Sequence, residues 1–256
     1  MDGPTSPAEL VFVAGATGYT GRAVVREAIA WGLDAVAHVR PDSARLDHWR
    51  AHFEELGARV DTTPWVPAEI QATLERLAPS QIHALLGTTR KRGKRGSGSA
   101  VADTYEAVDY GLPIMLLEAA LASGSRPRFV YLSALGADRP SMNAYMAVRR
   151  RVELAVRESG LPYVIARPGF ISGDDRDEPR AGERVASVIS DGVLSVLGAL
   201  GAKRTRARYS SLTGSELGAA LVRLACTADE DGVIAEADAL RAAATSRRGA
   251  SGFVRG

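Results

Sequence analysis

The chain has 256 residues, which is enough to bury a full hydrophobic core and suits one α/β domain better than two. With 46% apolar and 24% charged residues, its composition disfavours the disordered and membrane-embedded classes. The net charge of +2 does not indicate a general nucleic-acid-binding surface. The single cysteine, Cys226, lies in an apolar run, where a buried small side chain is expected rather than a nucleophile.

Strand-like and helix-like segments alternate along the chain, beginning with an apolar run at 9–14 and helical spacing at 19–31. This alternation is typical of parallel βαβ units, so we expect an α/β protein with a Rossmann-type, doubly wound parallel sheet. A capping-box spacing at Thr213 and Glu216 predicts a late helix. Further strands are expected near 34–39, 58–62, 82–87, 128–133, 162–166 and 232–237, and further helices near 42–56, 67–77, 102–123 and 143–159.

A series of glycines lies between the first expected strand and the first expected helix. Gly15 is expected to permit a tight turn, Gly18 to let the backbone approach a pyrophosphate, and Gly21 to let the helix pack closely. Backbone N–H groups at the start of the helix would then face the phosphates. The turn also occurs without a nucleotide, but its position between a strand and a helix favours a dinucleotide site. The residues expected to form it are Gly15, Thr17, Gly18, Tyr19, Thr20, Gly21 and Arg22.

A basic residue follows the second expected strand, where an NAD-specific site usually has an acidic residue that binds the ribose hydroxyls. Arg40 would pair there with a 2′-phosphate, so the sequence favours NADP(H) over NAD(H), and Arg22 is a second candidate for the same phosphate. A solvated surface arginine is the alternative for Arg40. Beyond the fourth expected strand, Gly87, Thr88 and Thr89 would bring backbone and hydroxyl groups to the adenosine half.

These residues, together with the stretches 87–90, 131–138, 145–149 and 167–171, resemble the atypical short-chain dehydrogenase/reductases. The likeness is strongest to the NmrA-like and Tat-interacting-protein-like NAD(P)H-binding oxidoreductase branch and covers most of residues 9–240. It implies a Rossmann fold, NADPH binding and, in active members, a catalytic serine, tyrosine and lysine. By position Ser133 matches the serine and Tyr145 the tyrosine. It also implies that the backbone of Pro168, Gly169, Phe170 and Ile171 meets the nicotinamide carboxamide.

The sequence departs from the family pattern at the lysine, because Arg149 stands four residues after Tyr145. Residues at this spacing share one helix face, so the cation would still lie beside the phenol and favour its ionised form. An arginine cannot relay a proton as an amine does, which puts proton transfer to solvent in doubt. The catalytic candidates are therefore Ser133, Tyr145 and Arg149, with a plain basic helix face as the alternative for Arg149.

The resemblance favours an NADPH-dependent reductase of a small carbonyl or related metabolite, in which Tyr145 gives a proton and Ser133 holds the oxygen. The main alternative is a catalytically silent NADP(H)-binding redox sensor of the NmrA-like type. A nucleotide-sugar epimerase or dehydratase is less favoured, because 256 residues leave little room for a large substrate domain. No metal site is expected, since His48 and His52 have no third ligand nearby.

We expect one domain at 8–240, in which 172–211 covers the substrate cleft, and flexible termini at 1–7 and 241–256. The basic run at 90–95 is expected to be a solvated loop, with a flap that reaches phosphates as the alternative. Residues 1–7 lack the features of a secretory signal, so a cytoplasmic location is expected. The expected partner is a small-molecule substrate, with no nucleic acid and no membrane, and the sequence leaves a homo-oligomer open.

Overall fold

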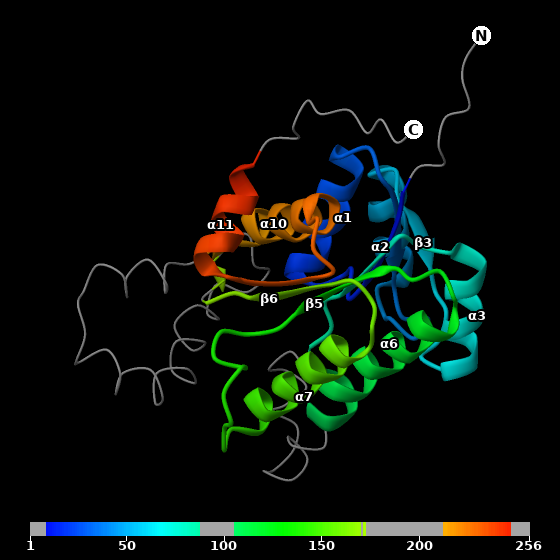
Figure 1. The fold of residues 1–256 in the computed structure, drawn as a ribbon. Coiled ribbons are helices and arrows are strands. Elements are labelled where there is room, and N and C mark those ends of the chain that lie inside the picture. The colour runs from blue at the N-terminus through cyan, green and yellow to red at the C-terminus, as the bar shows by residue number, and fades with distance from the viewer. Residues whose placement is uncertain (1–8, 88–104, 170, 173–211, 247–256) are drawn as a thin grey trace, which may run out of the picture.

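The computed structural model describes residues 9–87, 105–169, 171–172 and 212–246. In these residues seven parallel strands form one sheet in the order β3-β2-β1-β4-β5-β6-β9 (Figure 1). The order reverses between β1 and β4, which is where doubly wound sheets form their crevice. The strands are β1 (Leu10–Ala14), β2 (Asp34–His38), β3 (Arg59–Asp61), β4 (Gln81–Ala84), β5 (Arg128–Leu132), β6 (Tyr163–Arg167) and β9 (Gly232–Glu236), with a separate pair, β7 (Ile171–Ser172) and β8 (Leu212–Thr213).

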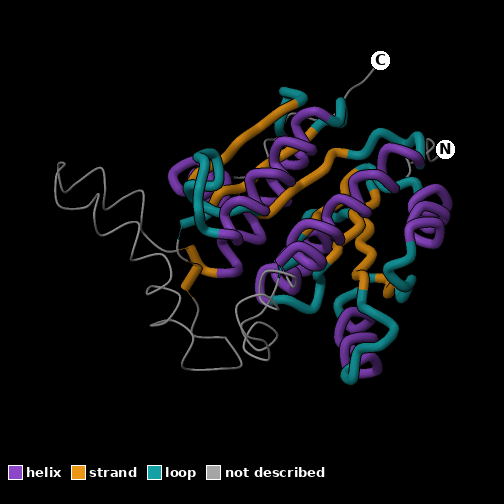
Figure 2. Tube along the Cα trace, turned by 90° about the horizontal axis from the view of Figure 1, so that it is seen from below, coloured by secondary structure: helices purple, strands orange, loops and turns teal. Residues whose placement is uncertain are grey.

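Helices cover both faces of this sheet, as Figure 1 shows, and in the view from below some of them lie in front of the strands (Figure 2). One layer packs on one face and consists of α1 (Tyr19–Ala30), α2 (Leu46–Glu55), α10 (Gly214–Thr227) and α11 (Ala237–Thr245). The other layer consists of α3 (Pro67–Leu77), α6 (Leu112–Ala122) and α7 (Ala144–Glu158). A π-helical segment, η1 (Tyr105–Gly111), precedes α6.

The central strand β1 shows why the sheet is covered on both sides. Val11 and Val13 belong to the core under α1 and α10, whereas Leu10 and Phe12 belong to the core under α3, α6 and α7. Successive side chains of a strand point to opposite faces, so an unbroken apolar run needs a helix layer on each face. The predicted doubly wound parallel sheet is confirmed.

The largest departure from the expected elements lies in the helix predicted at 102–123. Within the described residues it is divided into the π-helical η1 and the regular α6. Pro113, near the start of α6, has no N–H to donate to the preceding turn, so the regular ladder restarts there. At the C-terminal side, α11 extends to Thr245 and thus covers the first residues of the segment expected to be flexible. None of the described helices has the length and apolar character needed to cross a bilayer.

The helix α10, late in the chain, packs against the first helix, α1. The predicted capping box is confirmed, since the Thr213 side chain accepts from Glu216 N and the Glu216 side chain accepts from Thr213 N. A Cβ on Gly218 would lie 2.7 Å from the Cβ of Ala23, so only a glycine permits the observed contact between α10 and α1. The start of α10 is thereby placed beside the glycine turn that precedes α1.

Candidate active site

The glycine turn after β1 has the tight geometry that the sequence predicts. Gly15 has a φ of +85°, and a Cβ there would lie 2.6 Å from the carbonyl oxygen of Leu85. Gly18 N donates to Gly15 O at 3.0 Å, and a Cβ on Gly21 would lie 2.1 Å from that same oxygen. Glycine is therefore required at 15 and 21 by the backbone itself, and α1 starts in direct contact with the turn.

The first turn of α1 has no anion of its own. Gly18 caps the helix without a side-chain hydrogen bond, and no acidic residue stands in the first turn. Gly18 is exposed and Thr17 half-buried, whereas Thr20 is buried. The Tyr19 hydroxyl accepts from Gly214 N at 3.2 Å, so this side chain ties α1 to α10. An uncapped helix start with exposed backbone fits a pyrophosphate.

Arginines gather on the side of the site formed by β2 and the start of α2. Arg40 Nη1 lies 3.0 Å from Asp42 Oδ2, and both side chains are exposed to solvent. The guanidinium carbons of Arg22 and Arg45 lie 5.8 and 4.8 Å from the ring centroid of Trp49. An exposed ion pair such as Arg40–Asp42 contributes little free energy, so a phosphate could take the place of the carboxylate at low cost.

Arg149 is buried beneath the ends of β4 and β5. Its Nη2 donates to Asp109 Oδ1 at 2.9 Å, and its Nη1 donates to the carbonyl of Leu132 at 2.7 Å and to the Tyr131 hydroxyl at 3.2 Å. Arg149 is 5% exposed and Asp109 is 0% exposed. Gly87 leaves room for this guanidinium, since a Cβ there would lie 2.8 Å from Arg149 Nη2. Its expected contact with the adenosine half of the cofactor stays a prediction.

The surroundings of Arg149 keep it protonated. Burial acts to lower the pKa of its guanidinium, but the neighbouring oxygens of Tyr145, Tyr131 and Asp109 raise that pKa above its ordinary value. Burial raises the pKa of the Tyr131 hydroxyl to about 12, so Tyr131 stays neutral. Arg149 is therefore a fixed cation.

Tyr145 lies in the first turn of α7, one turn before Arg149. Asn143 caps the helix, with its Oδ1 accepting from the backbone N of Tyr145 at 3.0 Å. The Arg149 guanidinium carbon is 5.0 Å from the centroid of the Tyr145 ring, and the Tyr105 ring packs edge-on at 5.7 Å. Tyr145 and Arg149 thus share one face of α7, with the phenol half-buried.

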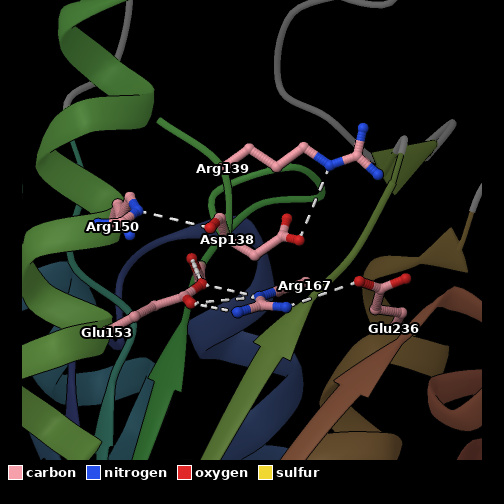
Figure 3. A network of polar contacts seen from close by, with 7 residues as sticks. Asp138, Arg139, Arg150, Glu153, Arg167 and Glu236 are labelled. Carbon is pink, nitrogen blue, oxygen red and sulfur yellow. Dashed lines mark hydrogen bonds and ion pairs between the residues drawn. The ribbon is translucent and has the colours of Figure 1, made fainter. Parts of the chain in front are cut away.

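Ser133, directly after β5, takes part in a buried polar network with Glu153 and Arg167, the last two of which are labelled in Figure 3. Its Oγ donates to Glu153 Oε1 at 2.5 Å, and Arg167 Nη2 donates to Glu153 Oε2 at 2.6 Å. Arg167 Nη1 also lies 3.7 Å from Glu236 Oε1. Hydrogen bonds to Glu153 are the main reason that the pKa of Arg167 is raised.

The segment after β6 lies next to the segment after β5. Leu135 N donates to Pro168 O at 3.1 Å, Gly169 is half-buried, and Ile171 pairs with Leu212 in the small β7–β8 sheet. The expected site residues Thr88, Thr89 and Phe170 lie outside the described residues. The basic run at 90–95 and all of the expected cleft region 172–211 except Ser172 lie outside them too.

The sequence alone did not indicate Glu153 as part of the site, and it included Tyr131 and Arg167 only within the stretches 131–138 and 167–171 that carry the family resemblance. A signal was present in α7, where Arg149 and Glu153 interrupt the buried apolar positions 148, 152 and 156. Two charges of opposite sign on the buried face of a helix require buried partners.

Two groups of polar side chains lie apart from these networks. His48 and His52 on α2 stack with ring centroids 6.4 Å apart, and Gln81 Nε2 lies 3.4 Å from Cys226 Sγ. Across the part of the chain that the structure describes, no three His, Cys, Asp or Glu side chains are grouped to hold a metal ion.

Comparison with known proteins identifies relatives of this chain. A family profile described as NAD(P)H-binding matches residues 15–196. Protein HTATIP2 of Rattus norvegicus is 31% identical over 182 residues, which is 69% of this chain and 68% of that protein. Protein TIC 62, chloroplastic, of Oryza sativa subsp. japonica is 32% identical over 64% of this chain, which spans only 36% of that protein. Divinyl chlorophyllide a 8-vinyl-reductase, chloroplastic, of Oryza sativa subsp. indica is 34% identical over 62% of this chain and 39% of its own length.

Solved structures share the fold at low sequence identity. A short-chain dehydrogenase/reductase family oxidoreductase from Burkholderia thailandensis has a TM-score of 0.63 and 18% identity, covering 90% of this chain and 91% of its own. Actinorhodin polyketide ketoreductase with NADPH has a TM-score of 0.59 and 16% identity, covering 91% and 97%. Some relatives are chloroplastic by name, so the expected cytoplasmic location of this chain stays a prediction.

Proposed function

Because the chain belongs to the NAD(P)H-binding, NmrA-like branch of the atypical short-chain dehydrogenase/reductases, we propose that it binds NADPH and reduces a small carbonyl compound or related metabolite. The observation that supports this most is the glycine turn. Gly15 at a φ of +85° and the uncapped start of α1 leave backbone groups where a pyrophosphate would lie.

The remaining proposed cofactor contacts lie at the carboxyl ends of the strands, as the glycine turn does. Arg40 would exchange Asp42 for the 2′-phosphate, with Arg22 beside it on α1. The backbone of Pro168 and Gly169, at the carboxyl end of β6, would meet the nicotinamide carboxamide. When bound, the cofactor would supply a hydride to the substrate.

Tyr145 is the proposed proton donor. Addition of a hydride to a carbonyl carbon leaves negative charge on the oxygen, and the half-buried Tyr145 hydroxyl would neutralise it by giving up its proton. The phenolate that remains is stabilised by the Arg149 cation, 5.0 Å from the ring. Arg149 keeps its own proton, so Tyr145 regains one from solvent and not through the guanidinium.

The second candidate is a silent NADP(H)-binding redox sensor, and one specific observation favours it. The Ser133 hydroxyl proton is directed to Glu153, and Arg149 is held by Asp109, so two of the three family positions are engaged inside the protein. A sensor needs the nucleotide site but not a proton donor.

Titration of the full chain with NADPH and with NADH, followed by nicotinamide fluorescence, tests the shared premise. The same samples are then mixed with a panel of carbonyl and quinone compounds while the absorbance of NADPH is monitored. Tight NADPH binding with oxidation supports the reductase, and tight binding with no oxidation supports the sensor. Absence of binding overturns both.

Replacement of Tyr145 by Phe separates binding from chemistry. Turnover should fall about 10²- to 10⁴-fold, because the proton donor is lost, while the Kd for NADPH stays within about twofold. A Tyr145→Phe variant with full turnover removes Tyr145 from the mechanism. Tyr163→Phe, which changes a half-buried tyrosine at the start of β6, is the matched control.

A further inference from the structure

Ser133, Glu153 and Arg167 join three elements at the carboxyl edge of the sheet. Ser133 follows β5, Glu153 lies in the middle of α7, and Arg167 ends β6. All three are more than nine-tenths buried. In Figure 3 the Glu153 side chain reaches from α7 toward Arg167, and the Arg167 guanidinium lies between Glu153 and Glu236.

The hydrogen bonds fix the direction of the Ser133 proton. Arg167 donates from Nε to Glu153 Oε1 at 3.0 Å and from Nη2 to Oε2 at 2.6 Å, a two-point contact with an ionised carboxylate. An ionised carboxylate only accepts hydrogen bonds, so Ser133 must be the donor in its 2.5 Å contact with Glu153. The Ser133 hydroxyl therefore has no proton left to donate to a bound molecule and can only accept a hydrogen bond from it.

The same residues hold the two segments that follow β5 and β6. Ser133 N donates to Ala166 O at 2.8 Å, and Leu135 N donates to Pro168 O at 3.1 Å. The Glu153 carboxylate therefore fixes one residue of each segment, Ser133 by its hydroxyl and Arg167 by its guanidinium. These segments contain the backbone that is proposed to meet the nicotinamide end of the cofactor.

We propose that Glu153, with Ser133 and Arg167, is a positioning unit of the cofactor site, and that Ser133 acts on a ligand only as a hydrogen-bond acceptor. The group that meets Ser133 is then a donor, such as an amide N–H or a hydroxyl, and not a carbonyl oxygen. This inference rests on the NADP(H) binding proposed above, which the reductase and the sensor share.

The binding test uses the full chain with Ser133→Ala, Glu153→Gln and the double variant. Each single change should raise the Kd for NADPH about tenfold, and the double variant should be no weaker than either single one, because residues of one unit act together. Glu158→Gln, the same change at an exposed position of α7, is the matched control and should bind as the parent chain does. Ser133→Thr keeps the hydroxyl and should restore most of the affinity that alanine loses.

A second readout needs no cofactor. Hydrogen exchange followed by mass spectrometry should show faster exchange in peptides covering 133–138 and 166–169 for Ser133→Ala, with the rest of the chain unchanged. If Glu153→Gln does not fold, the Ser133 variants carry the test alone.

The possible results are distinct. Parent-like affinity and parent-like exchange in Ser133→Ala overturn the positioning unit, as does full additivity of the two single changes. If the parent chain binds no NADPH, the proposed function fails, whereas the exchange experiment still decides whether the unit holds these two segments.

Discussion

The glycine turn with α1 and β2 presents uncapped backbone and solvent-exposed arginine, whereas Arg149 on α7 and Arg167 at the end of β6 are each buried against a carboxylate of the protein. On the first side, Gly18 caps α1 without a side chain and Arg40 pairs only with exposed Asp42. On the second side, Arg149 pairs with Asp109 and Arg167 with Glu153. In the first region the Arg40–Asp42 pair is exposed, so a nucleotide phosphate can replace the carboxylate, whereas the second region already holds Arg149 and Arg167 on buried partners.

This difference bears on which groups can act on a ligand. A buried charge with a fixed partner keeps its protonation state and its position. It can therefore orient neighbouring groups and stabilise an opposite charge, but it does not transfer a proton. Tyr145, half-buried at the start of α7 and beside Arg149, combines a titratable group with access to solvent. The following changes test the contrast, beginning with the largest expected effect.

Asp109→Ala should lower the free energy of unfolding by about 3–5 kcal/mol, because it leaves the Arg149 cation buried without its carboxylate. Urea denaturation of the two forms measures the difference. Arg151→Ala is the matched control, since the exposed Glu106–Arg151 pair joins the same two elements, η1 and α7, and should cost at most about 1 kcal/mol. Equal losses in the two variants would mean that burial of the ion pair has no consequence.

Gly15→Ala should cost about 3 kcal/mol and abolish NADPH binding, because it combines a positive φ with a contact to the Leu85 carbonyl. Gly57→Ala supplies the comparison, since Gly57 has a φ of +89° but no atom near the added carbon. It should cost only about 1–2 kcal/mol and leave binding intact. Thermal unfolding and NADPH titration of both variants separate backbone strain from steric overlap.

His83 lies in β4, the strand between the two regions, and burial lowers its pKa to about 3. In the unfolded chain the histidine takes up a proton near pH 6.5, whereas in the folded chain it does not. The free energy of unfolding is therefore highest above about pH 6.5 and decreases as the pH falls below this value. At pH 5 the loss relative to pH 7 should be about 2 kcal/mol. His83→Gln, which keeps a donor toward Gln81, should remove this part of the pH dependence in urea denaturation. A parallel pH profile in both forms contradicts the assignment.

Arg40→Ala should weaken NADPH by about tenfold, or about 1.4 kcal/mol, and leave NADH nearly unchanged, because only NADPH carries the 2′-phosphate. Arg59→Ala, at the opposite end of the neighbouring strand β3, should alter neither affinity. Equal losses for the two nucleotides in Arg40→Ala would remove the argument for NADP(H).

The parts of the fold set by local sequence could be predicted. The apolar runs and helical spacings gave the parallel sheet, and the spacing of Thr213 and Glu216 gave the cap of α10. Gly15 could be predicted to form a turn, because it follows a strand and a glycine adopts a positive φ without steric cost.

The parts that depend on contacts between distant residues could not be read in the same way. The position of Ser133 indicated a catalytic serine, but its partner Glu153 lies 20 residues away on another element. Likewise, the apolar spacing of α7 indicates that Arg149 lies on the buried face, but nothing local identifies its partner Asp109, 40 residues before it. The division of the expected helix at 102–123 into η1 and α6 could not be predicted either, because the segment has ordinary helical spacing.

The hydrogen bond from Gly214 N to the Tyr19 hydroxyl joins residues 195 positions apart. With Gly218 packed on Ala23, it makes α10 a structural partner of the first helix. During synthesis on a ribosome, the glycine turn therefore emerges long before α10 can cover its helix. The nucleotide turn reaches its final packing only after the chain has been made past residue 218, so a nascent chain shorter than this lacks the finished site.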